Sequence, residues 1–132
     1  MKTQFNLSWK RSKKKRKQRK FRLESPLHIR HKLISANLSE DLKKRYLRKS
    51  FSLRKDDTIR IMNGQFKNKT GKIILINSKK FKVYVEGVQR SKRDGTKVNV
   101  PIDPSNVQII AISLDDKQRL NALERKNKAI KK

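Results

Sequence analysis

The most restrictive feature of the sequence is a basic run that nothing nearby balances. Ten of the thirteen residues from Lys10 to Arg22 are Lys or Arg, and no Asp or Glu precedes Glu24. Such a run cannot contribute to a hydrophobic core, and its like charges repel one another. Residues 1–24 are therefore predicted to form an extended basic arm in the free protein. A polyanion would neutralise this arm, because each Lys or Arg that meets a phosphate releases a condensed counterion.

The whole chain has the same bias. It has 38 basic and 11 acidic residues in 132, a net charge of +27. Only 33% of the residues are hydrophobic and 37% are charged, which favours one modest core with polar extensions. A basic excess of this size indicates a nucleic-acid partner. A basic tail can also serve as a nuclear import signal or bind an anionic membrane, but this tail has few apolar residues to insert.

Composition also excludes several kinds of site. The absence of cysteine excludes disulfides, thiol nucleophiles and cysteine-based zinc sites, and His28 and His31 are too few for a typical zinc site. The sequence shows no cofactor loop, no metal cluster and no nucleophile beside a base. We therefore expect no catalytic residues, no metal and no cofactor. No stretch is apolar enough for a secretory signal or a membrane span, so we expect an intracellular protein without membrane insertion.

After the arm, residues 25–51 are predicted to be helical. Ser25 can cap a helix whose first turn contains Pro26 and which runs to about Ser35. A break at residues 36–37 follows, and a second short helix begins at Ser39, with acidic residues first and basic residues later, as the helix dipole favours. The side chains expected to pack inward are Leu27, Ile29, Leu33, Ile34, Leu38, Leu42 and Tyr46.

Residues 52–112 have the pattern of short strands. Apolar residues alternate with polar ones from Phe81 to Glu86, residues 77–80 suit a turn, and Asp94-Gly95 is typical of a hairpin turn. About five short strands favour a small closed barrel, so the fold class is mainly β. Residues 113–132 are predicted to form a basic C-terminal helix capped by Asp115 or Asp116. This helix has too little apolar surface for a core of its own.

The segment from Asp57 to Ile73 contains a strand, a glycine-containing loop and a second strand. Gly64 permits a tight turn with positive φ, and its missing side chain would let another backbone approach. Lys67 and Lys69 lie on the loop, and Gly71 restarts the next strand. This segment resembles the KOW motif, a strand–loop–strand unit of SH3-like barrels in ribosomal and transcription proteins.

Further motifs strengthen the resemblance. They are Ser25-Pro-x-His28-x-Arg30-x-Lys32, Leu38-Ser39-x-x-Leu42 with Tyr46, Arg54-Lys55-Asp56-Asp57, Val88-Gln89-Arg90, Asp94-Gly95-Thr96 and Pro104-Ser105-x-Val107. With them, residues 11–126 resemble the eukaryotic and archaeal form of the KOW-containing large-subunit ribosomal protein, universal family twenty-four, or twenty-six in older eukaryotic naming. The family usually has Gly where Asn68 stands, and Asn tolerates left-handed φ better than other non-glycine residues.

The resemblance implies a function and partners. Family members are structural, non-enzymatic constituents of the large subunit that bind and stabilise its RNA near the polypeptide exit tunnel and support assembly and translation. The implied partners are the 5′ domain of large-subunit rRNA, 5.8S-type rRNA, neighbouring large-subunit proteins and docking factors at the tunnel exit. The implied location is the cytoplasmic ribosome, with nuclear or nucleolar assembly in a eukaryote.

Candidate RNA contacts are basic residues and their neighbours in four places. On the arm they are Lys10, Arg11, Lys13, Lys14, Lys15, Arg16, Lys17, Arg19, Lys20 and Arg22. On the first helix they are His28, Arg30, His31 and Lys32. Around the KOW loop they are Arg54, Lys55, Gly64, Gln65, Phe66, Lys67, Lys69 and Lys72. On the hairpin they are Gln89, Arg90, Lys92, Arg93 and Lys97.

Several alternatives remain at this level. Phe66 can pack on the barrel, which we favour, or stack on an unpaired base. Asp56 and Asp57 are expected to form salt bridges or cap a turn rather than act as a catalytic pair. Alternative functions are a KOW module of a transcription elongation factor, an RNA-modifying enzyme and a binder of messenger RNA. The first would predict a larger accompanying domain and a less basic chain.

Overall fold

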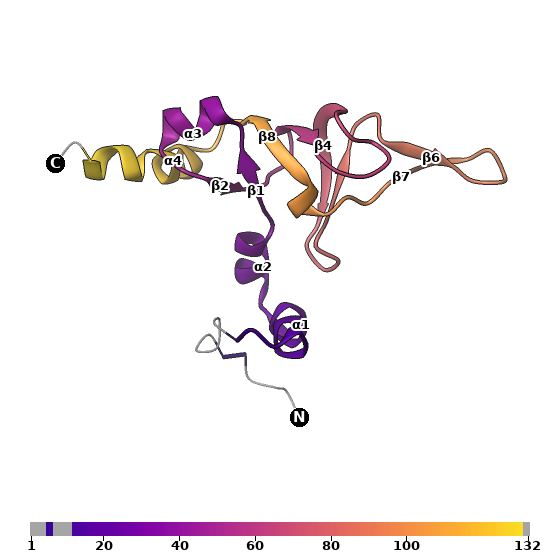
Figure 1. Cartoon of the computed structure of the whole chain (residues 1–132), viewed down its shortest axis with the longest axis horizontal. Coiled ribbons are helices and arrows are strands. Elements are labelled where there is room, and N and C mark those ends of the chain that lie inside the picture. The colour runs from indigo at the N-terminus through magenta and orange to yellow at the C-terminus, as the bar shows by residue number, and fades with distance from the viewer. Residues whose placement is uncertain (1–4, 7–11, 131–132) are drawn as a thin grey trace.

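A computed structural model of the chain describes residues 5–6 and 12–130, with side chains described as far as Arg125 (Figure 1). The elements in chain order are α1 (Lys15–Glu24), α2 (Leu27–Leu33), β1 (Ser35–Leu38), α3 (Glu40–Tyr46), β2 (Ser50–Ser52), β3 (Thr58–Ile61), β4 (Thr70–Asn77), β5 (Lys82–Val85), β6 (Gln89–Ser91), β7 (Lys97–Asn99), the 3₁₀ turn η1 (Pro104–Asn106), β8 (Val107–Ala111) and α4 (Lys117–Ile130).

Strands β1 to β5 and β8 form one strongly curved sheet in the order β2-β1-β8-β3-β4-β5, and β6 pairs with β7 in a separate hairpin. All pairings are antiparallel except that between β1 and β8. The register shifts at Thr58/Ile59 and between Ile73 and Leu75, and such irregularities bend a sheet. Two backbone hydrogen bonds between Val83 and Ile102, both 2.9 Å, extend the pairing beyond β5. The predicted mainly β, SH3-like barrel is confirmed.

The core of the barrel follows the period-two pattern that the sequence indicated. Ile59 and Ile61 of β3, Val83 and Val85 of β5 and Ile109 of β8 are all at most 1% exposed. Their neighbours on each strand point to the opposite face, as the strand pleat requires. The turn at residues 77–80 and the hairpin around Gly95 also lie where they were predicted.

The segment between the arm and the barrel differs from the prediction. Ser25 does not cap α2, because its hydroxyl donates to the carbonyl of Arg22 at 2.7 Å and Pro26 occupies the cap position. Leu27 is 61% exposed, so α2 does not bury the predicted apolar side. The predicted break at residues 36–37 is instead strand β1. The reason is tertiary, because Ala36 and Leu38 alternate into the core while β1 pairs with both β2 and β8. The two strands β1 and β2 thus belong to the sheet, although the segment was expected to be helical.

The prediction of an extended arm is wrong for Lys15–Glu24, which form helix α1. Lys, Arg and Gln are good helix formers, so local propensity competes with charge repulsion. Phe21 is buried, and its ring lies 4.9 Å from that of Phe5, which gives the helix an apolar contact. An i,i+4 ion pair between Lys20 and Glu24, at 3.8 Å, adds a little support.

Helices α3 and α4 confirm their predicted caps. The Ser39 hydroxyl accepts a hydrogen bond from the Leu42 backbone N–H at 3.5 Å, and Asp116 Oδ1 accepts one from Gln118 at 2.8 Å. Helix α4 lies beside α3, and its Leu123 is fully buried, so the helix packs on the rest of the chain instead of forming a core of its own. Figure 1 shows that three parts project from the barrel in different directions: α1 with α2, the β6–β7 hairpin, and α3 with α4. Within the described residues, none of these helices combines the length and apolarity needed to cross a membrane.

Candidate nucleic-acid interface

The KOW loop between β3 and β4 is held rigidly by its own backbone. The N–H of Asn68 donates to Ile61 at 2.8 Å, the N–H of Ile61 donates to Lys69 at 2.9 Å, and the N–H of Lys67 donates to Gly64 at 3.1 Å. Gly64 has φ of +94°, and Asn68 takes the left-handed φ of +67° expected of it. Lys67 and Lys69 are exposed at fixed positions as a result.

One prediction about the loop glycine is wrong. A Cβ atom built at Gly64 would meet nothing within 4 Å, so no backbone of this chain approaches it, and within the fold the residue supplies a positive φ. The close approach occurs instead at Gly71, where a Cβ would lie 2.8 Å from the carbonyl oxygen of Glu86 and 2.9 Å from a methyl of Val85. The reason is position, because the loop lies at the surface whereas Gly71 lies under the turn after β5.

Phe66 is half-buried and packs against the barrel core, which supports the packing interpretation. The ammonium of Lys69 lies 5.3 Å from the centre of its ring, a cation–π distance. The loop therefore carries its lysines beside a partly buried phenylalanine that packs on the core.

The β6–β7 hairpin projects from the barrel and carries exposed cations (Figure 1). Arg90 pairs with Val98 in register, and Lys92 and Thr96 close the turn through a 2.9 Å backbone hydrogen bond. Gly95 supplies the positive φ of +79° that the turn needs. Every residue from 89 to 98 is exposed, so the predicted contacts on this hairpin, Gln89, Arg90, Lys92, Arg93 and Lys97, all face solvent.

Helices α1 and α2 carry the densest charge. The predicted contacts from Lys13 to Arg22 that belong to the described chain are exposed, whereas Lys10 and Arg11 lie outside the described residues. His28, His31 and Lys32 are exposed on α2. Arg30 has internal partners: its Nε donates to Ser25 at 2.7 Å and its guanidinium lies 5.9 Å from the centre of the Phe81 ring. It therefore also ties α2 to the α1 junction and to the β4–β5 turn.

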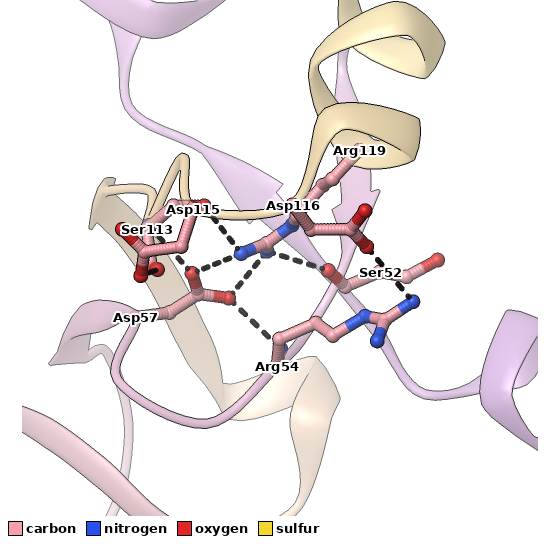
Figure 2. A network of polar contacts seen from close by, with 7 residues as sticks. All are labelled: Ser52, Arg54, Asp57, Ser113, Asp115, Asp116 and Arg119. Atoms are coloured by element: carbon pink, nitrogen blue, oxygen red, sulfur yellow. Dashed lines mark hydrogen bonds and ion pairs between the residues drawn. The ribbon is translucent and has the colours of Figure 1, made fainter.

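Asp57 is the centre of a polar network that fixes α4 to the barrel (Figure 2). Its Oδ1 accepts from the Ser113 backbone at 3.1 Å and from Arg119 at 2.7 Å. Its Oδ2 accepts from the Arg54 backbone at 2.8 Å and from Arg119 at 2.6 Å. Asp57 is fully buried and Arg119 is 6% exposed, and the arginine also donates to the carbonyl of Ser52 at 3.1 Å. The expectation that Asp57 forms a salt bridge and caps a turn is confirmed.

Sequence reasoning did not single out Arg119. In the sequence, Arg119 is one of many cations on a predicted helix whose position in the fold was unknown. Its partner, Asp57, lies 62 residues away in the chain. The predicted contacts Arg54 and Lys55 lie beside this network and are exposed, with the Arg54 guanidinium 3.7 Å from Asp116. The other predicted contact near the loop, Lys72, is exposed on β4.

The predicted residues do not converge on one pocket. They lie on α1 and α2, between β2 and β3, around the KOW loop and on the hairpin, and α1 with α2 projects from the barrel in a different direction from the hairpin (Figure 1). Among the described residues there is no group of three or more His, Cys, Asp or Glu that could hold a metal ion. Exposed cations spread over separate projections suit many contacts to phosphates rather than chemistry at one point.

These observations define a class of protein: a small SH3-like barrel with a KOW loop and strongly basic extensions. Comparison with known proteins identifies the family. A sequence profile that describes the ribosomal proteins named L26 in eukaryotes and their archaeal L24 counterparts matches residues 12–126. A large ribosomal subunit protein uL24 from Methanosphaera stadtmanae is 44% identical over 115 residues, which cover 87% of this chain and 98% of that protein. The namesake from Korarchaeum cryptofilum is 42% identical over 116 residues, 88% of each chain. The chain belongs to this ribosomal protein family.

Proposed function

We propose that the chain is a structural, non-enzymatic constituent of the large ribosomal subunit, where it binds and stabilises rRNA near the polypeptide exit tunnel and supports subunit assembly and translation. The observation that carries the proposal is the placement of exposed cations on three separate parts of the chain around one barrel, namely α1 with α2, the KOW loop and the hairpin. Membership of a family whose relatives are named large ribosomal subunit proteins supports the same conclusion.

The mechanism is electrostatic clamping. The barrel fixes the directions of the loop and the hairpin, so their cations meet phosphates that only the folded RNA brings together. Helix α1 has no acidic residue in its first turn, which is unfavourable for a helix dipole until an anion compensates it. A ligand that binds one state stabilises that state, so the protein favours folded rRNA over unfolded competitors.

The partners in this proposal are the 5′ domain of large-subunit rRNA, 5.8S-type rRNA, neighbouring large-subunit proteins and docking factors at the tunnel exit. The corresponding location is the cytoplasmic ribosome, with nuclear or nucleolar assembly if the source is a eukaryote. The hairpin is suited to enter an RNA groove, because Arg90 and Arg93 present planar guanidinium forks on an exposed two-stranded ribbon.

The test is fractionation of a tagged copy on sucrose gradients at low and then high salt. We expect co-migration with the large subunit and with polysomes that persists at high salt, because an extension threaded between RNA helices cannot leave by ion exchange alone. Recovery in light fractions only, or release from the subunit in moderate salt, would overturn the proposal. The elongation-factor and messenger-RNA interpretations would then become the better ones.

A further inference from the structure

A second basic site lies away from the loop and the hairpin, in a cleft between β2 and α4. The cleft encloses about 490 Å³, within the range of pockets that hold small ligands, roughly 300–1,000 Å³. The charged side chains that line it are Lys32, Arg48, Arg54, Arg119, Arg125 and a single carboxylate, Asp116. Asp116 faces Arg54 at 3.7 Å and Arg119 is paired with the buried Asp57, so the positive charge that the cleft offers to a ligand comes from Lys32, Arg48 and Arg125.

Two arginines that line the cleft have unused hydrogen-bond donors. Arg119 is 6% exposed, and its Nε is buried without an acceptor although both terminal nitrogens are bonded. The Nε of Arg48 is also buried without an acceptor, while its Nη2 donates to the carbonyl of Ala122 at 2.5 Å. A buried donor without a partner is unfavourable, and because neither Nε has accessible surface in this conformation, an acceptor from outside reaches it only when the side chain shifts.

The same two guanidinium groups lie against one aromatic ring. Their central carbons are 5.9 Å (Arg48) and 5.3 Å (Arg119) from the centre of the Phe51 ring. Phe51 belongs to β2, the edge strand of the sheet, so strand and ring hold both cations in place. The planar guanidinium of Arg48, held in this way, matches the oxygens of a phosphate, whereas the terminal nitrogens of Arg119 already bond Asp57.

We propose that the cleft between β2 and α4 binds a backbone phosphate of single-stranded or loop RNA. This inference rests on the proposed function and adds a site to it, since Arg48, Arg119 and Arg125 were not among the predicted contacts. A phosphate is favoured over an acidic peptide because Lys32 lines the cleft from α2, which continues the basic surface of α1 and α2. A strand that follows this surface passes the exposed cations of α1 and α2 before it reaches Lys32 at the cleft.

The first measurement uses the full chain in solution. The side-chain Nε–H signals of Arg48 and Arg119 are followed by ¹H–¹⁵N NMR during titration with inorganic phosphate and then with a hexauridylate RNA. Both ligands are expected to shift these two signals in a saturable way. If phosphate shifts them and the RNA does not, the proposal is overturned, and the cleft takes another anion such as an acidic peptide.

The second measurement uses a matched pair of variants on α4. Gln118 lines the cleft, whereas Asn121 is exposed on the same helix and does not line it. Gln118→Glu places a carboxylate in the cleft, while Asn121→Asp makes the same charge change outside it. Binding to a transcript of the rRNA 5′ domain is measured by fluorescence anisotropy over a range of salt concentrations. Gln118→Glu is expected to weaken binding and to reduce the salt slope by about one, and Asn121→Asp to leave both unchanged.

The outcomes separate this inference from the function on which it rests. Equal binding by Gln118→Glu and Asn121→Asp, with unmoved arginine signals, overturns the cleft site while the proposed function stands. Failure of the wild-type chain to prefer the rRNA transcript over an unrelated RNA of equal size overturns the proposed function itself. Circular dichroism of Gln118→Glu provides the control for folding.

Discussion

Replacing Asp57 by Asn tests the account of how α4 is held on the barrel. The substitution keeps the size of the side chain but removes its charge and turns one acceptor oxygen into a donor group. Asp57 is fully buried and accepts four hydrogen bonds, two of them from Arg119, which is 6% exposed. The variant therefore leaves a buried cation without its counter-ion. Breaking one side of a buried pair costs about 3–5 kcal/mol, a large part of the roughly 5–15 kcal/mol that stabilises a typical domain.

A second ion pair with the same distance serves as a control, because it separates the effect of burial on stability from the effect of ion-pair distance. Lys82 and Asp103 also lie 2.6 Å apart, but their side chains are 33% and 50% exposed. An exposed pair contributes roughly 0–1 kcal/mol, so Asp103→Asn is expected to change the unfolding free energy by less than about 1 kcal/mol. Urea unfolding followed by far-UV circular dichroism, at high salt to suppress surface electrostatics, gives both values. Equal costs for Asp57→Asn and Asp103→Asn would refute the reasoning.

The double variant Asp57→Asn with Arg119→Met completes the thermodynamic cycle. Removing both charges leaves no unpaired buried ion, so the double variant is expected to lose less stability than the sum of the two single variants. If the stability losses of the two single variants simply add, Asp57 and Arg119 do not interact energetically, and the network contributes to stability only through packing.

Three further predictions follow from local geometry. Gly71→Ala should lower the unfolding free energy by about 1–3 kcal/mol, because its Cβ would meet the Glu86 carbonyl at 2.8 Å; a neutral result in urea unfolding would contradict the close approach. Asn68→Val should be destabilising by roughly 1–3 kcal/mol because φ is +67°, whereas Asn68→Gly should be neutral or better. Arg90→Gln with Arg93→Gln should reduce the salt slope of rRNA binding by about two, and an unchanged slope would remove the hairpin from the interface.

The elements that could be predicted from the sequence are those whose partners are close in the chain. Strands β4 and β5 are joined by a four-residue turn, and strands β6 and β7 flank the turn at Asp94-Gly95. The alternation of apolar and polar residues, together with the turn residues, is therefore enough to predict these strands. Strand β1 could not be predicted in this way. It pairs in parallel with β8, where Asn37 lies opposite Gln108, and no local pattern reports a partner that distant.

The same distinction holds for the candidate site. Gly64 and Asn68 have the conformations that the turn chemistry predicted, because those depend only on the local backbone. The charge pattern did not predict helix α1, because the helix is supported by a contact between Phe21 and Phe5 that only the tertiary structure shows. The cleft between β2 and α4 was missed for the same reason, since its arginines are ordinary cations until the fold brings them to one ring.

The use of the acidic residues explains why so much positive charge remains for a partner. Asp57 pairs with Arg119 in the interior, and Asp103 pairs with Lys82. Other carboxylates serve helix ends and short-range pairs: Glu24 faces Lys20, Glu40 and Asp41 occupy the first turn of α3, Asp115 accepts from Ser113, and Asp116 caps α4 and faces Arg54. Seven or more of only 11 acids are thus engaged in local structure, against 38 cations. The few negative charges therefore serve the stability of the fold, and the excess of +27 stays available to an anionic partner.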